Sequence, residues 1–372
     1  MNLGWQIITN NEAFDTPLVA IYKERVEDNI KVALEMVDGD PGRLRPHIKT
    51  HKTGEIITLF LKYGIYKIKC ATIAEAELAA TNGITDVLLA YQPAGKKIER
   101  LISLIKGFPK VNFSCLIDNL QSAQQISIKA VQSNLTAVNV FIDLNTGMNR
   151  TGYPYNNQLA AFYTQVNSIT SINLKGIHIY DGHLDGLDDV LRAKPAELAL
   201  QTIYGECAEI AGMGLNYPLL IAGGSNTFSF YAQQQNIECS PGTFVFWDIN
   251  YLSKLPELKF KLAAVLVVTV ISKPADNMLC LDLGYKSVSS ESPINSRIFF
   301  PWNMDLVPVS QSEEHLVVQC KNDTTYQIGD RLYAIPNHIC PSIALYDELN
   351  VVVNNEIVAQ WEVIARRRRL CL

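Results

Sequence analysis

The first two-thirds of the chain alternates short apolar runs with longer amphipathic stretches. The apolar runs have strand character and are bounded by turn residues. They cover residues 44–49, 65–71, 86–91, 111–117, 137–143, 173–179 and 217–222. Segments with helical spacing lie between them, such as 188–211, and one of them stops at Asn82-Gly83, a typical helix end. The pattern predicts seven successive β-strand–α-helix units.

Repeated units of this kind predict a parallel sheet, either closed as a (β/α)8 barrel or open and doubly wound. An open sheet usually carries a glycine-rich phosphate turn at its first strand–helix junction. Here that junction reads Lys49-Thr50-His51-Lys52, and the first glycine is Gly54. This favours the barrel. Its eighth strand has two candidates, residues 17–22 and 237–241.

The pattern changes after Asp248. Strand-like runs follow with turns between them, at 260–271, 278–283, 315–319, 331–335, 351–353 and 357–365. They predict a mostly antiparallel β-domain. Residues 284–312 form a long connection rich in Ser and Pro, and such connections are often functional. We therefore expect an α/β protein with a TIM-type barrel over 22–248 and a C-terminal β-domain built from 249–372 with 1–21.

Composition narrows the class of protein. Among the 372 residues, 48% are apolar and the net charge is −5, which is ordinary for a soluble protein and does not suggest a nucleic-acid surface. The one basic run, Arg366 to Arg369, is best interpreted as a solvated or interface-facing strand end. The longest apolar stretch is too short to cross a bilayer. The eight cysteines lack disulfide-type spacing and the N-terminus lacks a signal-peptide pattern, which predicts a cytoplasmic location.

The segment Arg45-Pro46-His47-Ile48-Lys49 is the first candidate for chemistry. On a strand, Arg45, His47 and Lys49 would share one face, and at the C-terminal end of a barrel strand that face is the active-site mouth. A lysine crowded by basic neighbours is favoured as an amine nucleophile. The alternative is a solvated charge on the rim, which the crowding of basic groups makes the weaker interpretation.

A second candidate follows the run at 217–222. Gly223 and Gly224 allow close backbone approach, and Ser225 and Thr227 supply hydroxyl donors beside Asn226. On a late barrel strand this suits a phosphate held by backbone amides. The alternative is a plain turn with a helix N-cap.

Three further side chains follow strands. Arg150 is suited to an anionic ligand oxygen, or else to a surface ion pair. Tyr180 shares a strand face with His178 and is suited to contact with a planar ring. His183 is a candidate acid, base or ligand, or a hydrogen-bonded loop histidine.

A candidate metal site lies near the C-terminus. His338 and Cys340 are two residues apart in a segment bounded by Pro336 and Pro341, so an extended backbone would face them the same way. Imidazole with thiolate suits Zn2+, and two protein ligands leave open positions for water and substrate. The alternative is a rigid loop with a buried cysteine. The neighbouring run Glu313-Glu314-His315 is a possible source of another ligand.

Together these motifs resemble the D-serine dehydratase and D-threonine aldolase group, relatives of alanine racemase with a barrel-type pyridoxal-phosphate fold. The two specific motifs are Arg45-Pro46-His47-Ile48-Lys49-Thr50-His51-Lys52 and Pro336-Asn337-His338-Ile339-Cys340-Pro341. Weaker matches cover 16–18, 71–76, 146–152, 180–183, 223–225 and 241–243.

The resemblance implies a role for each matching residue. Lys49 is similar to the lysine that holds pyridoxal phosphate as a Schiff base, with His47 and Tyr180 beside the cofactor and Arg150 near its phenolate. The Gly223–Ser225 segment resembles the phosphate loop, extended by Asn226 and Thr227. Asn226 departs from the small residue or proline usual in the family.

For the metal, the resemblance implies zinc bound by His338 and Cys340, as in D-serine dehydratases. D-Threonine aldolases carry an aspartate in place of the cysteine, so Cys340 favours a dehydratase. The resemblance also implies a homodimer. It assigns residues 44–49 to the first barrel strand and 17–22 to the β-domain.

The sequence leaves four functions open. A zinc-dependent lyase would convert D-serine to pyruvate and ammonia, with Lys49 removing the Cα proton. A retro-aldol lyase would cleave a D-3-hydroxy amino acid and needs a base for the hydroxyl proton, for which His183 and His51 are candidates. A racemase needs a second base and no metal. A non-catalytic pyridoxal-phosphate carrier would keep Lys49 without needing His338 and Cys340.

Overall fold

The computed structural model describes residues 4–156, 158–185 and 188–371. The chain divides into two compact units. The first, called here the barrel unit, comprises Ala33–Lys49, Gly54–Gly242 and Arg367–Leu372. The second, called the β-unit, comprises Met1–Val32, Thr50–Thr53 and Thr243–Arg366.

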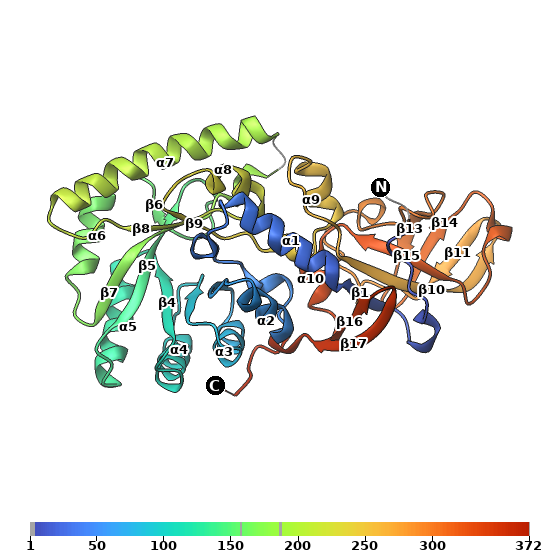
Figure 1. Ribbon diagram of the computed structural model, residues 1–372, viewed down its shortest axis with the longest axis horizontal. Helices are drawn as coiled ribbons and strands as arrows, with labels where there is room; N and C mark the ends of the chain where they lie inside the picture. Colours follow the sequence, from blue (N-terminus) through green and yellow to red (C-terminus); the bar gives the residue numbers. More distant parts are fainter. Residues whose placement is uncertain (1–3, 157, 186–187, 372) are drawn as a thin grey trace. The chain divides into compact units, whose positions relative to one another are not determined.

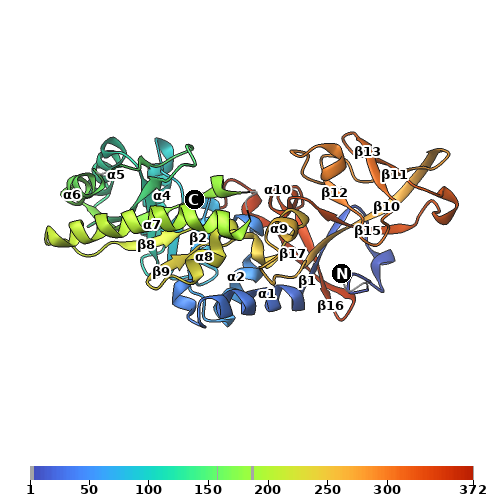
Figure 2. The same cartoon turned by 90° about the horizontal axis from the view of Figure 1, so that it is seen from above.

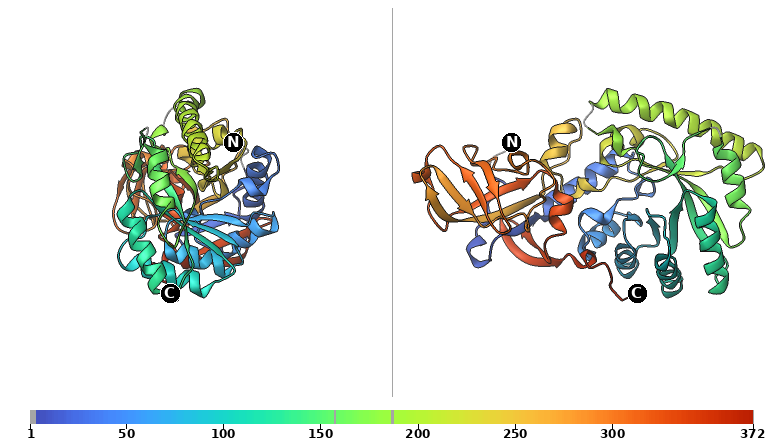
Figure 3. Two further views of the ribbon diagram at one scale, coloured as in Figure 1. Left: turned by 90° about the vertical axis from the view of Figure 1, so that its left-hand side faces the viewer. Right: turned by 180° about the vertical axis from the view of Figure 1, so that it is seen from behind.

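Parallel strands alternate with helices in the barrel unit, as the left-hand view of Figure 3 shows. The strands are β2 (Lys67–Cys70), β3 (Asp86–Leu89), β4 (Asn112–Ile117), β5 (Val138–Asn145), β7 (Ile172–Ile179), β8 (Leu219–Ala222) and β9 (Ile237–Cys239), with a short β6 (Tyr153–Pro154) beside β5. The helices are α2 (Gly54–Lys62), α3 (Ile73–Thr81), α4 (Lys96–Gly107), α5 (Leu120–Gln132), α6 (Leu159–Asn167), α7 (Asp189–Gly212) and α8 (Phe228–Ala232). Asp188 caps α7, which is labelled in Figures 1 and 2.

Residues 44–47 close this sheet into a barrel. Leu44 bridges Cys239 of β9 on one side, and His47 bridges Lys69 of β2 on the other, both in parallel. The segment therefore joins the first and last strands of the order β2-β3-β4-β5-β7-β8-β9. Residues 44–47 and the seven strands of this order together form eight barrel strands, called staves below. This count confirms the predicted (β/α)8 barrel. The eighth stave is β9, one of the two candidates from the sequence.

The first stave is shorter than predicted. Pro46 has no amide proton to donate to the ladder, which limits its pairing. The chain then turns into a 3-10 helix, Ile48–Thr50, so Lys49 does not lie on the strand. The prediction that Arg45, His47 and Lys49 share one strand face was therefore wrong.

Arg45 belongs instead to an ion cluster inside the barrel. Its side chain is 3% exposed, with Nη1 2.6 Å from Asp86 and Nε 2.7 Å from Glu238. Asp86 is the first residue of β3, so this cluster lies toward the N-terminal ends of the strands. An apolar cluster of Leu88, Leu116, Phe141 and Ile221 fills the barrel interior. This is the packed core expected of a small barrel rather than a pore.

The β-unit contains the predicted mostly antiparallel sheet, labelled in Figure 1. Its strands are β1 (Leu18–Tyr22), β10 (Ala264–Ala275), β11 (Met278–Leu281), β12 (Ile298–Phe299), β13 (Val307–Gln311), β14 (Leu316–Gln319), β15 (Arg331–Pro336), β16 (Glu348–Val353) and β17 (Glu356–Glu362). The helices α9 (Ile249–Lys254) and α10 (Ile339–Ile343) accompany them, and α1 (Lys23–Met36) follows β1. β1 pairs antiparallel with β10 and parallel with β16. The candidate strand at 17–22 therefore belongs to this sheet.

The long connection at 284–312 is more ordered than the sequence indicates. It contains β12 and β13, and β13 pairs antiparallel with β14. Most side chains of β13 are exposed, so this strand lacks the apolar run that reveals the buried strands. Across the described ranges, no helix combines the length and the hydropathy that crossing a membrane requires.

We predict that Arg45→Met destabilises the barrel by about 3 kcal/mol, because it leaves two partly buried carboxylates without their cation. The free energy of unfolding from urea titration measures this. Lys96→Met is the matched control, since Lys96 pairs with Glu99 at the surface with its side chain 83% exposed, where such pairs contribute about 0–1 kcal/mol. Equal losses in the two variants would contradict a structural role for Arg45.

Candidate active site

A polar pocket lies within the barrel unit, and side chains from several strand ends line it. Its lining contains His47, Lys49, Lys69, Asp143, Arg150, His178 and Tyr180, together with apolar Ala90, Leu116, Leu144 and Met148 and with Thr151. Lys49, His47, Arg150 and Tyr180 were predicted from the sequence, and the fold brings these four together. The C-terminal ends of barrel strands are where such sites form.

Lys49 is an exposed side chain at the turn that follows the first stave. Its backbone amide donates to His47 Nδ1 at 3.3 Å. That contact connects the orientation of the imidazole with the turn that carries the lysine. Lys49 thus has both an accessible amine and a fixed backbone, which a covalent ligand site requires.

Tyr180 and Arg150 form a stacked pair in the pocket. The Arg150 guanidinium carbon lies 5.0 Å from the centroid of the Tyr180 ring. The ring fits only because two neighbours are glycines. A Cβ at Gly182 would approach it to 2.6 Å, and one at Gly224 to 3.0 Å. The glycines of two separate motifs therefore make room for one aromatic ring.

A buried chain of polar groups, which the sequence analysis missed, reaches the same pocket. Lys69 Nζ lies 3.0 Å from His178 Nε2, and His178 Nδ1 lies 2.7 Å from Asp143 Oδ1. Burial and the nearby Lys49 charge lower the pKa of Lys69 to about 7. Burial and the Lys69 charge lower the pKa of His178. Burial alone would raise the pKa of Asp143, but the hydrogen bond from His178 holds it below its ordinary value.

The glycine loop after β8 is held by its own side chains. Thr227 Oγ1 donates to Asp181 Oδ1 at 2.7 Å, and Asn226 Nδ2 donates to the Asp181 carbonyl at 3.3 Å. Both side chains therefore position the loop. The hydrogen bond to the Asp181 carbonyl gives Asn226 a structural role that a small residue at this position could not fill. Gly223 has φ +75°, where a side chain would be strained and would approach Tyr231 to 2.7 Å.

One buried hydroxyl beside this loop lacks a hydrogen-bond partner among the residues that the structure describes. Ser240 follows β9, and its amide donates to the carbonyl of Ala222, the last residue of β8. The residue is 3% exposed, and its Oγ finds no hydrogen-bond partner in the described part of the chain. A phosphate group would satisfy such a donor. The loop, this hydroxyl and the adjacent cationic pocket together fit pyridoxal phosphate.

The two candidate bases differ in access. His183 is exposed and packs over Gly147, where a Cβ would approach its Nε2 to 2.7 Å. His51 is 0% exposed, and its Nδ1 contacts Thr53 Oγ1 at 3.2 Å. Burial lowers the pKa of His51 to about 3, so it stays neutral and away from solvent. Of the two, only His183 has the access that proton transfer to a ligand requires.

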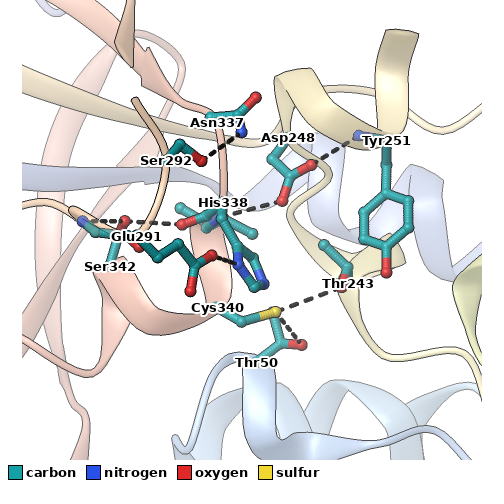
Figure 4. A network of polar contacts seen from close by, with 12 residues as sticks. Thr50, Thr243, Asp248, Tyr251, Glu291, Ser292, Asn337, His338, Cys340 and Ser342 are labelled. Atoms are coloured by element: carbon teal, nitrogen blue, oxygen red, sulfur yellow. Dashed lines mark hydrogen bonds and ion pairs between the residues drawn. The ribbon is translucent and has the colours of Figure 1, made fainter. Parts of the chain in front are cut away.

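The metal candidates lie in the β-unit and are close together (Figure 4). Cys340 hydrogen-bonds to the His338 imidazole, and a Glu291 carboxylate oxygen contacts His338 Nδ1. Thr50 Oγ1 lies 3.1 Å and Thr243 Oγ1 3.4 Å from Cys340 Sγ. Burial would lower the pKa of His338, but Cys340 and Glu291 raise it to about 9. Metal binding would displace the proton that this pair retains.

The start of a short helix brings His338 and Cys340 together, instead of the extended backbone that the sequence predicted. His338 is the N-cap of α10 and Cys340 lies in its first turn, so the segment is not extended at the cysteine. Glu313 and Glu314 pair with Lys286 and are not part of this cluster. Glu291 also belongs to this cluster, and no sequence pattern indicated it, because it lies 47 positions from His338.

The donor set fits a metal with open coordination positions. No group of three or more His, Cys, Asp or Glu ligands occurs within the described residues, so a closed structural zinc site is absent there. A histidine ligand whose other ring nitrogen contacts a carboxylate is the usual metal-site arrangement, and Glu291 supplies that carboxylate. Imidazole and thiol donors suit zinc.

Two models of protein families match the chain. The model of the alanine racemase N-terminal domain matches residues 21–249, and that of a putative serine dehydratase domain matches 263–352. A D-threonine aldolase from Arthrobacter sp. is 26% identical over 361 residues, covering 95% of this chain and 93% of the relative. A D-serine dehydratase from Dictyostelium discoideum is 24% identical over 389 residues, covering 94% and 96%.

Among solved structures, a D-threonine aldolase from Filomicrobium marinum has the same fold, with a TM-score of 0.85 at 23% identity and 95% of each chain covered. These matches confirm the predicted resemblance, and the curated relatives confirm the predicted enzyme class, a lyase. The chain belongs to the alanine racemase family of pyridoxal-phosphate-dependent enzymes, in which it is similar to the D-threonine aldolases and D-serine dehydratases.

Proposed function

We propose that the protein is a pyridoxal-phosphate- and zinc-dependent lyase of D-3-hydroxy amino acids, with D-serine as the substrate and pyruvate and ammonia as the products. The observation that carries the proposal is the His338–Cys340 pair, in which the thiol and the Glu291 carboxylate both contact the imidazole. Lys49 lines the polar pocket of the barrel unit, so the chain offers a candidate cofactor lysine as well as a candidate metal pair. On a 3-hydroxy amino acid, a carbonyl cofactor would act at Cα and a metal ion would act at the 3-hydroxyl.

Each group would supply one kind of chemistry. Bound pyridoxal phosphate would withdraw electrons from Cα of the amino acid, and bound zinc would polarise the 3-hydroxyl as a Lewis acid. The residues of the chain do the rest. The Lys49 amine would hold the cofactor and, in its free form, would accept the Cα proton. Arg150 would bind an anionic oxygen beside Tyr180, and the glycine loop with Ser240 would hold the phosphate.

A retro-aldol cleavage to glycine and an aldehyde is the second candidate. The accessible His183 favours it, because that reaction needs a base for the hydroxyl proton. Cys340 favours the dehydratase, since its thiol is the ligand that the resemblance assigns to that activity. The homodimer and the cytoplasmic location stay predictions.

Incubation of the purified protein with D-serine and with D-threonine tests the reaction. We expect pyruvate from D-serine, loss of that activity with a chelator and recovery with added zinc. Glycine from D-threonine would move the assignment to the aldolase. Inversion without cleavage, unaffected by the chelator, would contradict both lyase assignments and indicate a racemase.

The cofactor lysine is tested by borohydride reduction of the protein with pyridoxal phosphate, followed by peptide mapping. We expect the reduced adduct on Lys49, and its loss in Lys49→Ala. Lys52→Ala is the matched control from the same motif and should retain the adduct. An adduct on Lys52 in the wild type, or no loss in Lys49→Ala, would rule out the assignment.

The metal site is tested through Glu291. Because Glu291 contacts His338 Nδ1, which would leave Nε2 as the metal-binding nitrogen, Glu291→Gln should weaken zinc binding about 10- to 100-fold. Equilibrium dialysis against a zinc chelator measures the affinity. Glu313→Gln is the control, since the Glu313 side chain is 61% exposed and its carboxylate pairs with Lys286. Unchanged zinc affinity in His338→Ala and Cys340→Ala would place any bound metal elsewhere.

A further inference from the structure

The pocket contains a second lysine that the proposed function does not use. Lys69 comes from β2, is 3% exposed and lines the same pocket as Lys49. Its Nζ lies 3.0 Å from His178 Nε2. A buried lysine usually pairs with a carboxylate, because its charge is costly to bury. Here the amine meets an imidazole instead, which can accept a hydrogen bond from it while remaining neutral.

Behind the imidazole stands a carboxylate. Asp143 Oδ1 lies 2.7 Å from His178 Nδ1, and Asp143 Oδ2 accepts from Thr151 Oγ1 at 2.8 Å. An ionised Asp143 holds the proton on Nδ1 and leaves the Nε2 lone pair facing Lys69. A carboxylate, an imidazole and a reactive group in this order form the arrangement that activates nucleophiles and bases.

The charges around Lys69 oppose one another. Burial has the largest effect and disfavours its ammonium form, as do the charges of Lys49 and Arg45, while Asp143 and Asp181 favour it. The resulting pKa of about 7 leaves both forms of the amine populated at neutral pH. Such a group can give and take a proton at little cost.

Two more groups face this pair. The Tyr180 ring centroid lies 5.8 Å from Lys69 Nζ, and the Arg150 charge disfavours protonation of His178. His178 is therefore kept neutral from two sides. Lys69 is therefore the group of this cluster that gains and loses a proton near neutral pH.

We propose that Lys69 is a second acid–base residue of the pocket, supported by His178 and Asp143 and coupled to Lys49 through charge. When a ligand loses a proton to it, the electron pair stays on the ligand and the proton goes to Nζ, and the reverse transfer returns the proton. The proposal rests on the proposed function only in taking that ligand to be an amino acid.

Trace labelling with acetic anhydride, from pH 5 to pH 10, tests the coupling in the full chain without any cofactor. Peptide mass spectrometry follows Lys69, and N-acetyl-lysine amide is the internal standard. Lys69 should reach half-maximal reactivity near pH 7. Lys49→Ala should raise that midpoint because it removes a repelling charge, and Asp143→Asn should lower it because it removes an attracting one. A Lys69 midpoint at about pH 10.4, the ordinary lysine value, or a midpoint that neither change moves, would overturn the proposal.

Two substitutions separate proton transfer from fixed charge. Lys69→Arg keeps the charge but cannot exchange a proton, and Lys69→Met keeps the length without charge. Both should lower kcat by about 100-fold or more while Lys49 still binds the cofactor in the borohydride assay. Near wild-type kcat in Lys69→Arg would mean that only the charge matters and would overturn the proposal.

The tests also separate this proposal from the lysine assignment. A cofactor adduct that fails to form on Lys49 in the wild type counts against the proposed function, whereas the labelling midpoint of Lys69 is measured without cofactor. If either substituted protein unfolds, as thermal melting would reveal, the labelling of wild-type protein decides.

Discussion

Closure of the barrel at residues 44–47 is the constraint on which the pocket depends. Three backbone hydrogen bonds of 2.9 Å hold this segment, from Arg45 N to the Cys239 carbonyl, from His47 N to the Pro241 carbonyl and from Lys69 N to the Pro46 carbonyl. They join the last stave to the first and the first to β2. The turn that carries Lys49 follows directly, so closure determines where its amine lies. The same closure puts Lys69 on the adjacent stave.

The inside of the barrel is layered because successive inward side chains on a strand are two residues apart. On β3 and just beyond it, Asp86 pairs with Arg45, Leu88 belongs to the apolar cluster and Ala90 lines the pocket. The alternation of inward and outward side chains along the strands thus produces three layers. These are the ion cluster at one end of the barrel, the apolar core in the middle and the polar pocket at the other end. The apolar layer excludes water from the base of the pocket, where Lys69 and His178 are buried, and this strengthens the interactions among their charges.

The sequence predicted the barrel well because buried parallel strands appear as continuous apolar runs. Lys49 was identified by its position at a strand end, although it lies in a 3-10 turn. Lys69 was missed, although the same rule applies to a lysine near the end of β2. His178 was seen only as a neighbour of Tyr180. Its link to Asp143 crosses between strands, which a linear pattern does not report.

The β-unit was harder to predict at the level of single contacts. The five-residue α10 is too short to leave a helical period, so the segment of His338 and Cys340 looked extended. Glu291 lies in a connection whose apolar pattern is weak, and its contact with His338 is purely tertiary. The residue types alone indicated the His–Cys pair, while its carboxylate partner required the fold.

A crystal structure of the protein with pyridoxal phosphate, from diffraction data recorded on both sides of the zinc absorption edge, would locate the cofactor and the metal in one experiment. We expect continuous density from Lys49 Nζ to the cofactor, the cofactor phosphate at the loop that starts at Gly223, and an anomalous peak within bonding distance of His338 and Cys340. A covalent link at Lys69, or a zinc peak away from that pair, would contradict this expectation.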